Sequence, residues 1–315
     1  MAASAGCADS GTRPSVYEGA DLSIADATVV NRSWAQRFVS QLCRSLFLRQ
    51  TGFLLLSRML FKVLLFVFVA IVAKHLAQSE FGDFQFVVGI INIVSQPAVI
   101  VSLVVARLGC RFQDATRGAN LRWVSQQAAM PLLLVFALIA LVFSVLDPWL
   151  MRLGDLAAPG SFLIVGVLVA CTFMLHFFLG MLQSLERFYL IGGAFLAMGV
   201  LNVSFGVVIV HWDLGILSAY GAQALAALLA LLLSIVATNA VLPKWGAGPD
   251  LRRFSVPRYT ALALLSVGIF FVVYNMDIIV TKIVFDRSTA GYYARLAFFG
   301  KGSFLLASTL ALVVF

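Results

Sequence analysis

The sequence predicts an all-α protein that crosses a membrane eight times, and three observations support this fold class. Of its 315 residues, 62% are hydrophobic and 11% are charged, and the mean hydropathy is +1.00. A water-soluble domain cannot bury so much apolar surface. Eight apolar runs of 19 to 23 residues are each long enough to cross a hydrocarbon layer of about 30 Å, because a helix rises about 1.5 Å per residue. We therefore expect a polytopic membrane protein and exclude an ordinary soluble enzyme.

The eight predicted spans are continuously apolar, whereas the strands of a membrane β-barrel alternate apolar and polar residues over about ten positions. Helices are the remaining structure that satisfies the backbone polar groups inside a bilayer. The predicted spans are residues 53–73, 84–106, 128–146, 161–182, 188–210, 214–236, 260–281 and 293–315.

The basic residues predict how the spans are oriented. Of 22 Lys and Arg residues, fourteen precede span 1 or follow spans 2, 4 and 6, four lie in the alternate connections, and four lie within spans. Because basic loops remain in the cytoplasm, we expect a cytoplasmic N-terminus. The connections expected to face outward are those near residues 75–83, 147–160, 211–213 and 282–292. The net charge of +8 is then a property of topology, and we expect no nucleic-acid partner.

The N-terminal region differs from the rest of the chain. The first thirty residues have one arginine against four acidic residues and are rich in Ala, Ser and Gly, so residues 1–33 are expected to be a disordered cytoplasmic tail. In residues 34–49, apolar side chains recur every four positions beside arginines, which predicts an amphipathic helix lying on the inner leaflet. A plain helical lead-in to span 1 explains the same pattern.

Motifs of soluble-enzyme chemistry are missing from the sequence. The three histidines fall in different segments without metal-ligand spacing, the four cysteines are dispersed, and no nucleotide-binding or G-x-S-x-G motif occurs. We expect no cofactor, no metal site and no catalytic residues. Transport or scaffolding is favoured over catalysis.

An internal repeat relates the second span to the last. The chain reads S-E-F-G-D-F at residues 79–84 and S-T-A-G-Y-Y at residues 288–293, with Gly82 and Gly291 separated by 209 residues. The same shift superimposes span 1 on span 7 and span 2 on span 8. We expect each glycine to lie in a tight turn, where it lets the backbone reverse.

Several of these motifs together resemble one transporter family. The first span contains a basic residue, residues 73–84 read A-K-H-L-A-Q-S-E-F-G-D-F, Arg107 closes the second span, and Y-N-M-D-I-I-V (274–280) precedes A-G-Y-Y-A (290–294). This combination is similar to the O-antigen and polysaccharide flippases of the multidrug/oligosaccharidyl-lipid/polysaccharide exporter superfamily. The resemblance implies a MATE-like architecture of two six-helix lobes in the bacterial inner membrane. It also implies a substrate, undecaprenyl-diphosphate-linked oligosaccharide, that is moved outward by alternating access for lipopolysaccharide or other surface polysaccharide, with polysaccharide polymerase or assembly proteins as possible partners.

Members of that family carry twelve or fourteen spans, and this chain has eight. We therefore expect a fragment or truncated product with one six-helix lobe (50–236), a cytoplasmic linker (237–259) and the first hairpin of the second lobe (260–315). Two other functions remain open. A cation-coupled multidrug antiporter of the same superfamily would share the fold but should have an acidic or aromatic cavity, and a membrane polymerase or glycosyltransferase would need a large outward loop.

Charged residues within spans are the first candidate site residues, since each costs about 2.5–3.5 kcal/mol at the centre of a membrane helix. Lys62 is nine residues into span 1, about 14 Å deep, and Arg58 lies one turn earlier on the same helix face. Two cations in one stripe suit a diphosphate. Alternatively, Arg58 extends to the headgroups and Lys62 pairs with a polar neighbour. In span 8, Lys301 is about 12 Å deep and is a further substrate-binding candidate.

Polar residues in other spans extend this candidate site. Asn92 and Gln96 lie one turn apart in span 2, before Pro97, and are expected either to line a sugar cavity or to hydrogen-bond between helices. In span 7, Asp277 with nearby Asn275 is a candidate for binding a coupling ion. A salt bridge from Asp277 to Lys282 or Arg287 is the alternative.

Small and packed residues complete the predictions. His176 is expected to be a packed, hydrogen-bonded residue rather than a proton relay. Small residues on spans 5 and 6 are expected to let helices pack closely; they are Gly192, Gly193, Ala197, Gly199, Ala222, Ala226 and Ala230.

Overall fold

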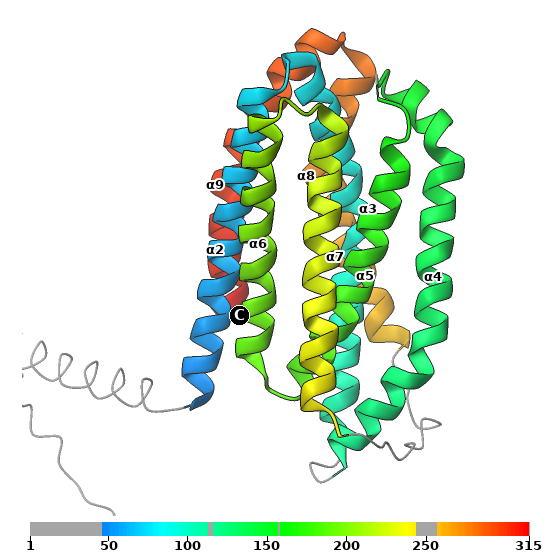
Figure 1. Ribbon diagram of the computed structural model, residues 1–315, viewed down its shortest axis with the longest axis vertical. Coiled ribbons are helices and arrows are strands. Elements are labelled where there is room, and N and C mark those ends of the chain that lie inside the picture. Colours follow the sequence, from blue (N-terminus) through cyan, green and yellow to red (C-terminus); the bar gives the residue numbers. More distant parts are fainter. Residues whose placement is uncertain (1–45, 113–115, 157, 244–256, 315) are drawn as a thin grey trace, which may run out of the picture. The chain divides into compact units, whose positions relative to one another are not determined.

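The computed structural model describes residues 46–112, 116–156, 158–243 and 257–314, and these form an all-helical bundle (Figure 1). The chain divides into two compact units, Met1–Arg49 and Gln50–Phe315, and the bundle belongs to the second. Its helices are α2 (Leu46–His75), α3 (Gln78–Cys110), α4 (Arg117–Leu153), α5 (Ser161–Ser184), α6 (Phe188–His211), α7 (Ile216–Val241), α8 (Pro257–Val284) and α9 (Arg287–Val314).

Each predicted span falls almost wholly within one of these helices. Six of them, α2 to α7, are long and apolar enough to cross a membrane within the part of the chain that the structure describes. These six helices indicate a multi-pass membrane protein. The predicted tail and residues 34–45 of the predicted interfacial helix lie outside the described residues, whereas residues 46–49 are the first four of α2.

The connections between helices alternate between the two ends of the bundle. The end that carries the α2–α3, α4–α5, α6–α7 and α8–α9 connections is at the top of Figure 1 and is called the upper end below. These are the four connections that the sequence places on one side of the membrane. That grouping is confirmed, while the direction of insertion stays a prediction.

Several connections are shorter than predicted because the helices continue past the apolar runs. Only Leu76 and Ala77 separate α2 from α3, and only Phe285 and Asp286 separate α8 from α9. A polar side chain caps the start of α3, because Glu80 accepts a hydrogen bond from the backbone N–H of Ala77 at 3.1 Å. The predicted linker 237–259 is also partly helical, since α7 extends to Val241 and α8 begins at Pro257, and residues 244–256 lie outside the described part.

The bundle is organised around α3 and α5. Helix α5 packs against α3, α4 and α7, whereas α4 lies at the right edge of Figure 1 and is largely exposed. Helix α3 packs on one face against α5 and on another against α8 and α9. Helix α3 therefore connects the last hairpin, α8–α9, to the other helices of the bundle.

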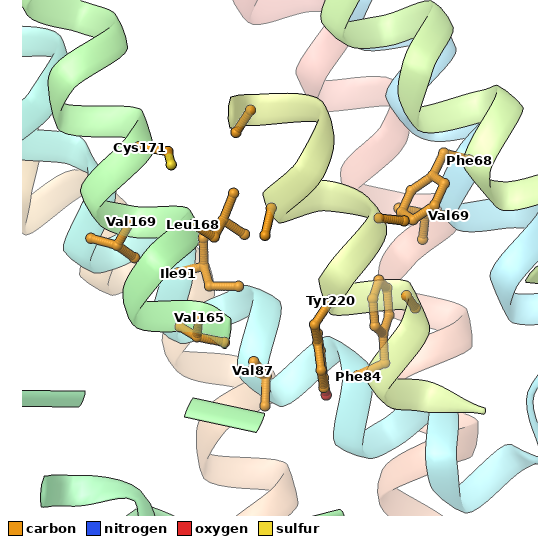
Figure 2. Close-up of a cluster of buried hydrophobic side chains, with 14 of the residues drawn as sticks. Phe68, Val69, Phe84, Val87, Ile91, Val165, Leu168, Val169, Cys171 and Tyr220 are labelled. Carbon is orange, nitrogen blue, oxygen red and sulfur yellow. The ribbon is translucent and has the colours of Figure 1, made fainter. Parts of the chain in front are cut away.

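A buried apolar cluster fills the space between α2, α3, α5 and α7 (Figure 2). The ring of Phe84 on α3 stacks against Tyr220 on α7, with centroids 5.6 Å apart. Both side chains are fully buried. Residues labelled in Figure 2 from the four helices are Phe68, Val69, Phe84, Val87, Ile91, Val165, Leu168, Val169, Cys171 and Tyr220.

A stripe of glycines on α6 lets α2 approach closely. A Cβ atom on Gly192 would lie 2.7 Å from the hydroxyl of Ser57, and one on Gly199 would lie 2.9 Å from Leu64. Gly206, which sequence reasoning missed, continues the same stripe seven residues later and faces Phe68. The expected close packing is confirmed for Gly192 and Gly199, whereas Gly193 faces open space.

The other small residues divide in a similar way. Ala222, Ala226 and Ala230 are buried along α7, as the close-packing prediction requires. Ala197 is half-buried.

The expected role of Gly82 and Gly291 as turn residues is wrong. Both lie inside helices, and neither has a positive φ. A Cβ on Gly82 would lie 3.1 Å from the Cα of Gly291, and a Cβ on Gly291 would clash with the carbonyl oxygen of Gln78. The two glycines therefore face each other where α3 crosses α9, and the absence of side chains there lets the helices touch.

Contacts on either side of this crossing follow the repeat. Gly89 on α3 meets Asn275 on α8, where an added Cβ would lie 3.9 Å from the Cβ of Asn275. The positions 209 residues away reproduce this contact, because Phe298 on α9 stacks on Phe66 of α2 with centroids 4.5 Å apart. The hairpins α2–α3 and α8–α9 thus pack through equivalent positions.

Candidate functional site

A group of basic side chains lies within the membrane-crossing part of α2 and α5. The guanidinium carbon of Arg58 lies 5.2 Å from the ring centroid of Phe195 on α6. Arg58 also interacts electrostatically with Lys62, one turn further along α2, and with His176 on α5. A cation–π contact positions a guanidinium without neutralising its charge.

His176 is packed as the sequence predicted, and its hydrogen bond defines its tautomer. Its Nδ1 lies 2.9 Å from the carbonyl oxygen of Thr172, one turn earlier on α5. A carbonyl accepts only, so Nδ1 donates and a neutral ring has its acceptor at Nε2. Sequence reasoning did not place this histidine near Arg58, because no periodicity relates positions on α2 to positions on α5. Arg58, Lys62 and His176 are called the basic cluster below.

Lys301 and Asp277 form an ion pair between α9 and α8. The Lys301 ammonium lies 2.6 Å from Asp277 Oδ1 and 4.8 Å from the ring centroid of Tyr274. The hydroxyl of Tyr293 donates to Asp277 Oδ2 at 3.1 Å. The predicted salt bridge from Asp277 to Lys282 or Arg287 is therefore wrong, since those cations contact another carboxylate.

The structure does not bring Asn275 and Asp277 to one site. Asn275 is buried against α3 and donates to the carbonyl of Phe271 at 2.8 Å, while Asp277 turns towards α9. Residues two apart on a helix point in different directions. Asn92 and Gln96 are both half-buried on α3, one turn apart.

A buried ion cluster at the upper end was missed by sequence reasoning. Lys282 Nζ lies 2.6 Å from Asp83 Oδ1, and an Arg287 nitrogen lies 2.6 Å from Asp83 Oδ2. The side chains of Asp83 and Lys282 are 3% and 2% exposed, whereas Arg287 is 35% exposed. Tyr220 donates to the backbone carbonyl of Asp83 at 3.4 Å, which ties the cluster to the core of Figure 2.

The available sequence signal for this cluster was weak. Asp83 immediately precedes a predicted span and Lys282 immediately follows another, so both resemble ordinary interfacial charges. The neighbouring repeat glycine, Gly82, was the only clue that this position faces the second hairpin.

Three further contacts join the same two hairpins at the upper end. The side-chain amide of Gln78 donates to the carbonyl of Ser288 at 3.0 Å. Arg295 donates to the carbonyl of Leu76 at 3.2 Å and lies over the ring of Phe81. Polar groups thus join the upper ends of α2–α3 and α8–α9 beside the Gly82–Gly291 crossing.

Comparisons with protein-family models, with curated proteins and with solved structures gave no match.

Proposed function

We propose that this chain belongs to the machinery that moves an undecaprenyl-diphosphate-linked oligosaccharide across the bacterial inner membrane, with its N-terminus in the cytoplasm. The observation that carries this proposal is the basic cluster, in which Arg58 and Lys62 lie one turn apart on α2 and Arg58 also interacts electrostatically with His176 of α5. Charges at this depth are costly, and proteins keep them for substrate paths or relays. A diphosphate is an anion that two cations one turn apart can bind.

The geometry of the cluster fits this substrate class. Arg58 can hold phosphate oxygens through two N–H groups, whereas Lys62 acts as a compact point charge. The stripe lies on α2, which packs against α6 through the glycine stripe and against α9 through Phe66. In this arrangement α2, the helix that carries the cations, contacts both α6 and the last hairpin. Movement of the hairpin would then alter the surroundings of the bound anion.

The proposed roles of Lys301 and Asp277 follow from their ion pair. Lys301 binds substrate only if Asp277 gives up its ammonium partner, and Asp277 binds a coupling ion only under the same condition. The two events are therefore linked in this proposal, because an anion that draws Lys301 away leaves the Asp277 carboxylate open to a proton or metal cation. The polar side chains of Asn92 and Gln96 are assigned to the sugar.

Substitution of Lys62 tests the proposal in a flippase-deleted strain that displays surface polysaccharide only when a transporter is supplied. Lys62→Met removes the charge but keeps side-chain length, and it removes a desolvation cost, so folding should be unchanged or improved. A charge-assisted contact contributes about 1.5–3 kcal/mol, so substrate affinity should fall about tenfold to a hundredfold. We expect display to be lost at normal membrane protein level, whereas Lys62→Arg keeps part of it.

The matched control is Lys74→Met. Lys74 lies at the end of the same helix and is exposed. This substitution removes the same charge about 18 Å away along the axis, and display should persist. Normal display from Lys62→Met at normal expression would show that the cation is dispensable and would refute the assignment of the site.

A further inference from the structure

The ion pairs and the hydrogen bond that attach the last hairpin to α3 lie towards the upper end of the bundle, beside the Gly82–Gly291 crossing. They are the Asp83 ion cluster and the hydrogen bond from Gln78 to Ser288. Apolar contacts continue further down, where Phe66 on α2 stacks on Phe298 of α9. Further down, α8 has exposed apolar side chains at Leu262, Leu265, Ile269 and Phe270. Among the described residues, the ion pairs that attach this hairpin to α3 are therefore concentrated at the upper end.

The chemistry of the Asp83 cluster differs from that of a permanent helix contact. Buried ion pairs stabilise a fold little compared with apolar side chains of the same size, because both charges are removed from water. An apolar contact exposes hydrophobic surface when it opens. By contrast, an ion cluster that separates into water regains the hydration of each charge. Such a contact can open and close at low net cost.

The cluster is also unevenly charged. One carboxylate, Asp83, is shared by two cations, Lys282 and Arg287, so the three groups carry a net positive charge while closed. The mutual repulsion of the cations weakens the closed state, and the 35% exposure of Arg287 gives water a route to the cluster. The carboxylate comes from α3, whereas the two cations come from the end of α8 and the start of α9.

We propose that Asp83, Lys282 and Arg287 form a latch between the two hairpins, which holds the upper end of the bundle closed and separates when that end opens. The closed latch corresponds to the conformation described above. This role deepens the proposed transport function, because it assigns the step that exposes the upper end. The latch itself is a property of the protein without substrate, so it can be tested separately.

The test uses double electron–electron resonance to measure the distance between the upper end of α6 and the connection between α8 and α9. Spin labels are placed at Trp212, at the end of α6, and at Phe285, between α8 and α9, which are 67% and 55% exposed. The full chain is used in lipid nanodiscs, with the native cysteines replaced. Asp83→Asn leaves both cations without their carboxylate, which should shift the equilibrium towards separated ends on the order of a hundredfold. We expect a new population at longer distance.

The matched control is Asp277→Asn, which removes an ion pair of the same 2.6 Å length between α8 and α9. That pair lies within one hairpin, so the measured distance should not change. If Asp83→Asn fails to accumulate, Arg287→Gln is the decisive variant, because it leaves the neutral Asp83–Lys282 pair in place. It should give a smaller population at the longer distance.

Unchanged distance distributions in folded Asp83→Asn, or in Arg287→Gln where Asp83→Asn does not accumulate, would overturn the latch. Equal lengthening in Asp277→Asn would also overturn it, because the effect would then follow from the loss of any ion pair. A latch that opens as expected, together with normal polysaccharide display from Lys62→Met, would leave the latch standing and remove the proposed substrate.

Discussion

The close crossing of α3 and α9 predicts that alanine substitutions at Gly82 and Gly291 differ in their effect on stability. Gly82 and Gly291 are equivalent in the repeat, yet their surroundings differ. A Cβ on Gly82 would lie 3.1 Å from the Cα of Gly291, so a shift of a few tenths of an ångström relieves the contact. A Cβ on Gly291 would clash with the backbone carbonyl oxygen of Gln78, which no side-chain rotation can relieve.

The magnitudes follow from opposing effects. Alanine stabilises a helix interior by about 0.5–1 kcal/mol relative to glycine. Overpacking by one carbon costs about 1–3 kcal/mol. For Gly82→Ala we therefore expect a net loss of about 0–2.5 kcal/mol, and for Gly291→Ala a loss at or above the upper end of this range. Gly193→Ala is the control, because its Cβ would meet nothing within 4 Å. Only the gain in helix stability from alanine is then expected.

The assay is unfolding of the purified full-length protein in detergent, followed by helical circular dichroism during titration with a denaturing detergent. The expected order of stability is Gly193→Ala at or above the wild type, then Gly82→Ala, then Gly291→Ala. If Gly291→Ala were as stable as Gly193→Ala, the close crossing of α3 and α9 would be wrong, and so would the packing of the two hairpins through equivalent positions.

The remaining predictions concern topology and pH. Cysteines introduced at Glu80 and Asp213 should react with impermeant thiol reagents applied to intact cells, while one at Arg117 should not; the reverse pattern would contradict a cytoplasmic N-terminus. Asp286 accepts a hydrogen bond from the backbone N–H of Thr289 at 3.0 Å, and its hydrogen bonds to Thr289 lower the pKa of this exposed carboxyl below its usual 3.8. Because this pKa is lower in the folded than in the unfolded protein, the ionised carboxylate stabilises the start of α9 at pH values above the unfolded pKa. The stabilisation is lost as the pH falls through the folded pKa. Amide exchange at Thr289, corrected for its intrinsic pH dependence, should therefore rise below about pH 4, and the rise should be absent in Asp286→Ala.

The candidate site was only partly predictable from the sequence. Arg58 and Lys62 were found because a charge within an apolar run is conspicuous, and their one-turn spacing follows from helix geometry. The contribution of His176 could not be found in this way, since its approach to Arg58 depends on how α2 and α5 lie in the bundle. The partner of Asp277 was predicted wrongly for a related reason. Lys282 and Arg287 are closer along the chain, but Lys301 on the next helix is closer in space.

The sequence by itself determined the helices and the ends at which their connections lie. A bilayer offers no hydrogen bonds to the backbone, so each long apolar run must form a helix, and successive runs must alternate in direction. The tertiary structure alone decided which residues meet between helices. Gly82 and Gly291 carry a repeat visible in the sequence, but only the crossing of α3 and α9 shows that they face each other within helices. Asp83 has the appearance of an interfacial charge until two cations from the second hairpin are found against it. Hydropathy and periodicity describe one helix at a time, whereas these contacts join residues about 200 positions apart.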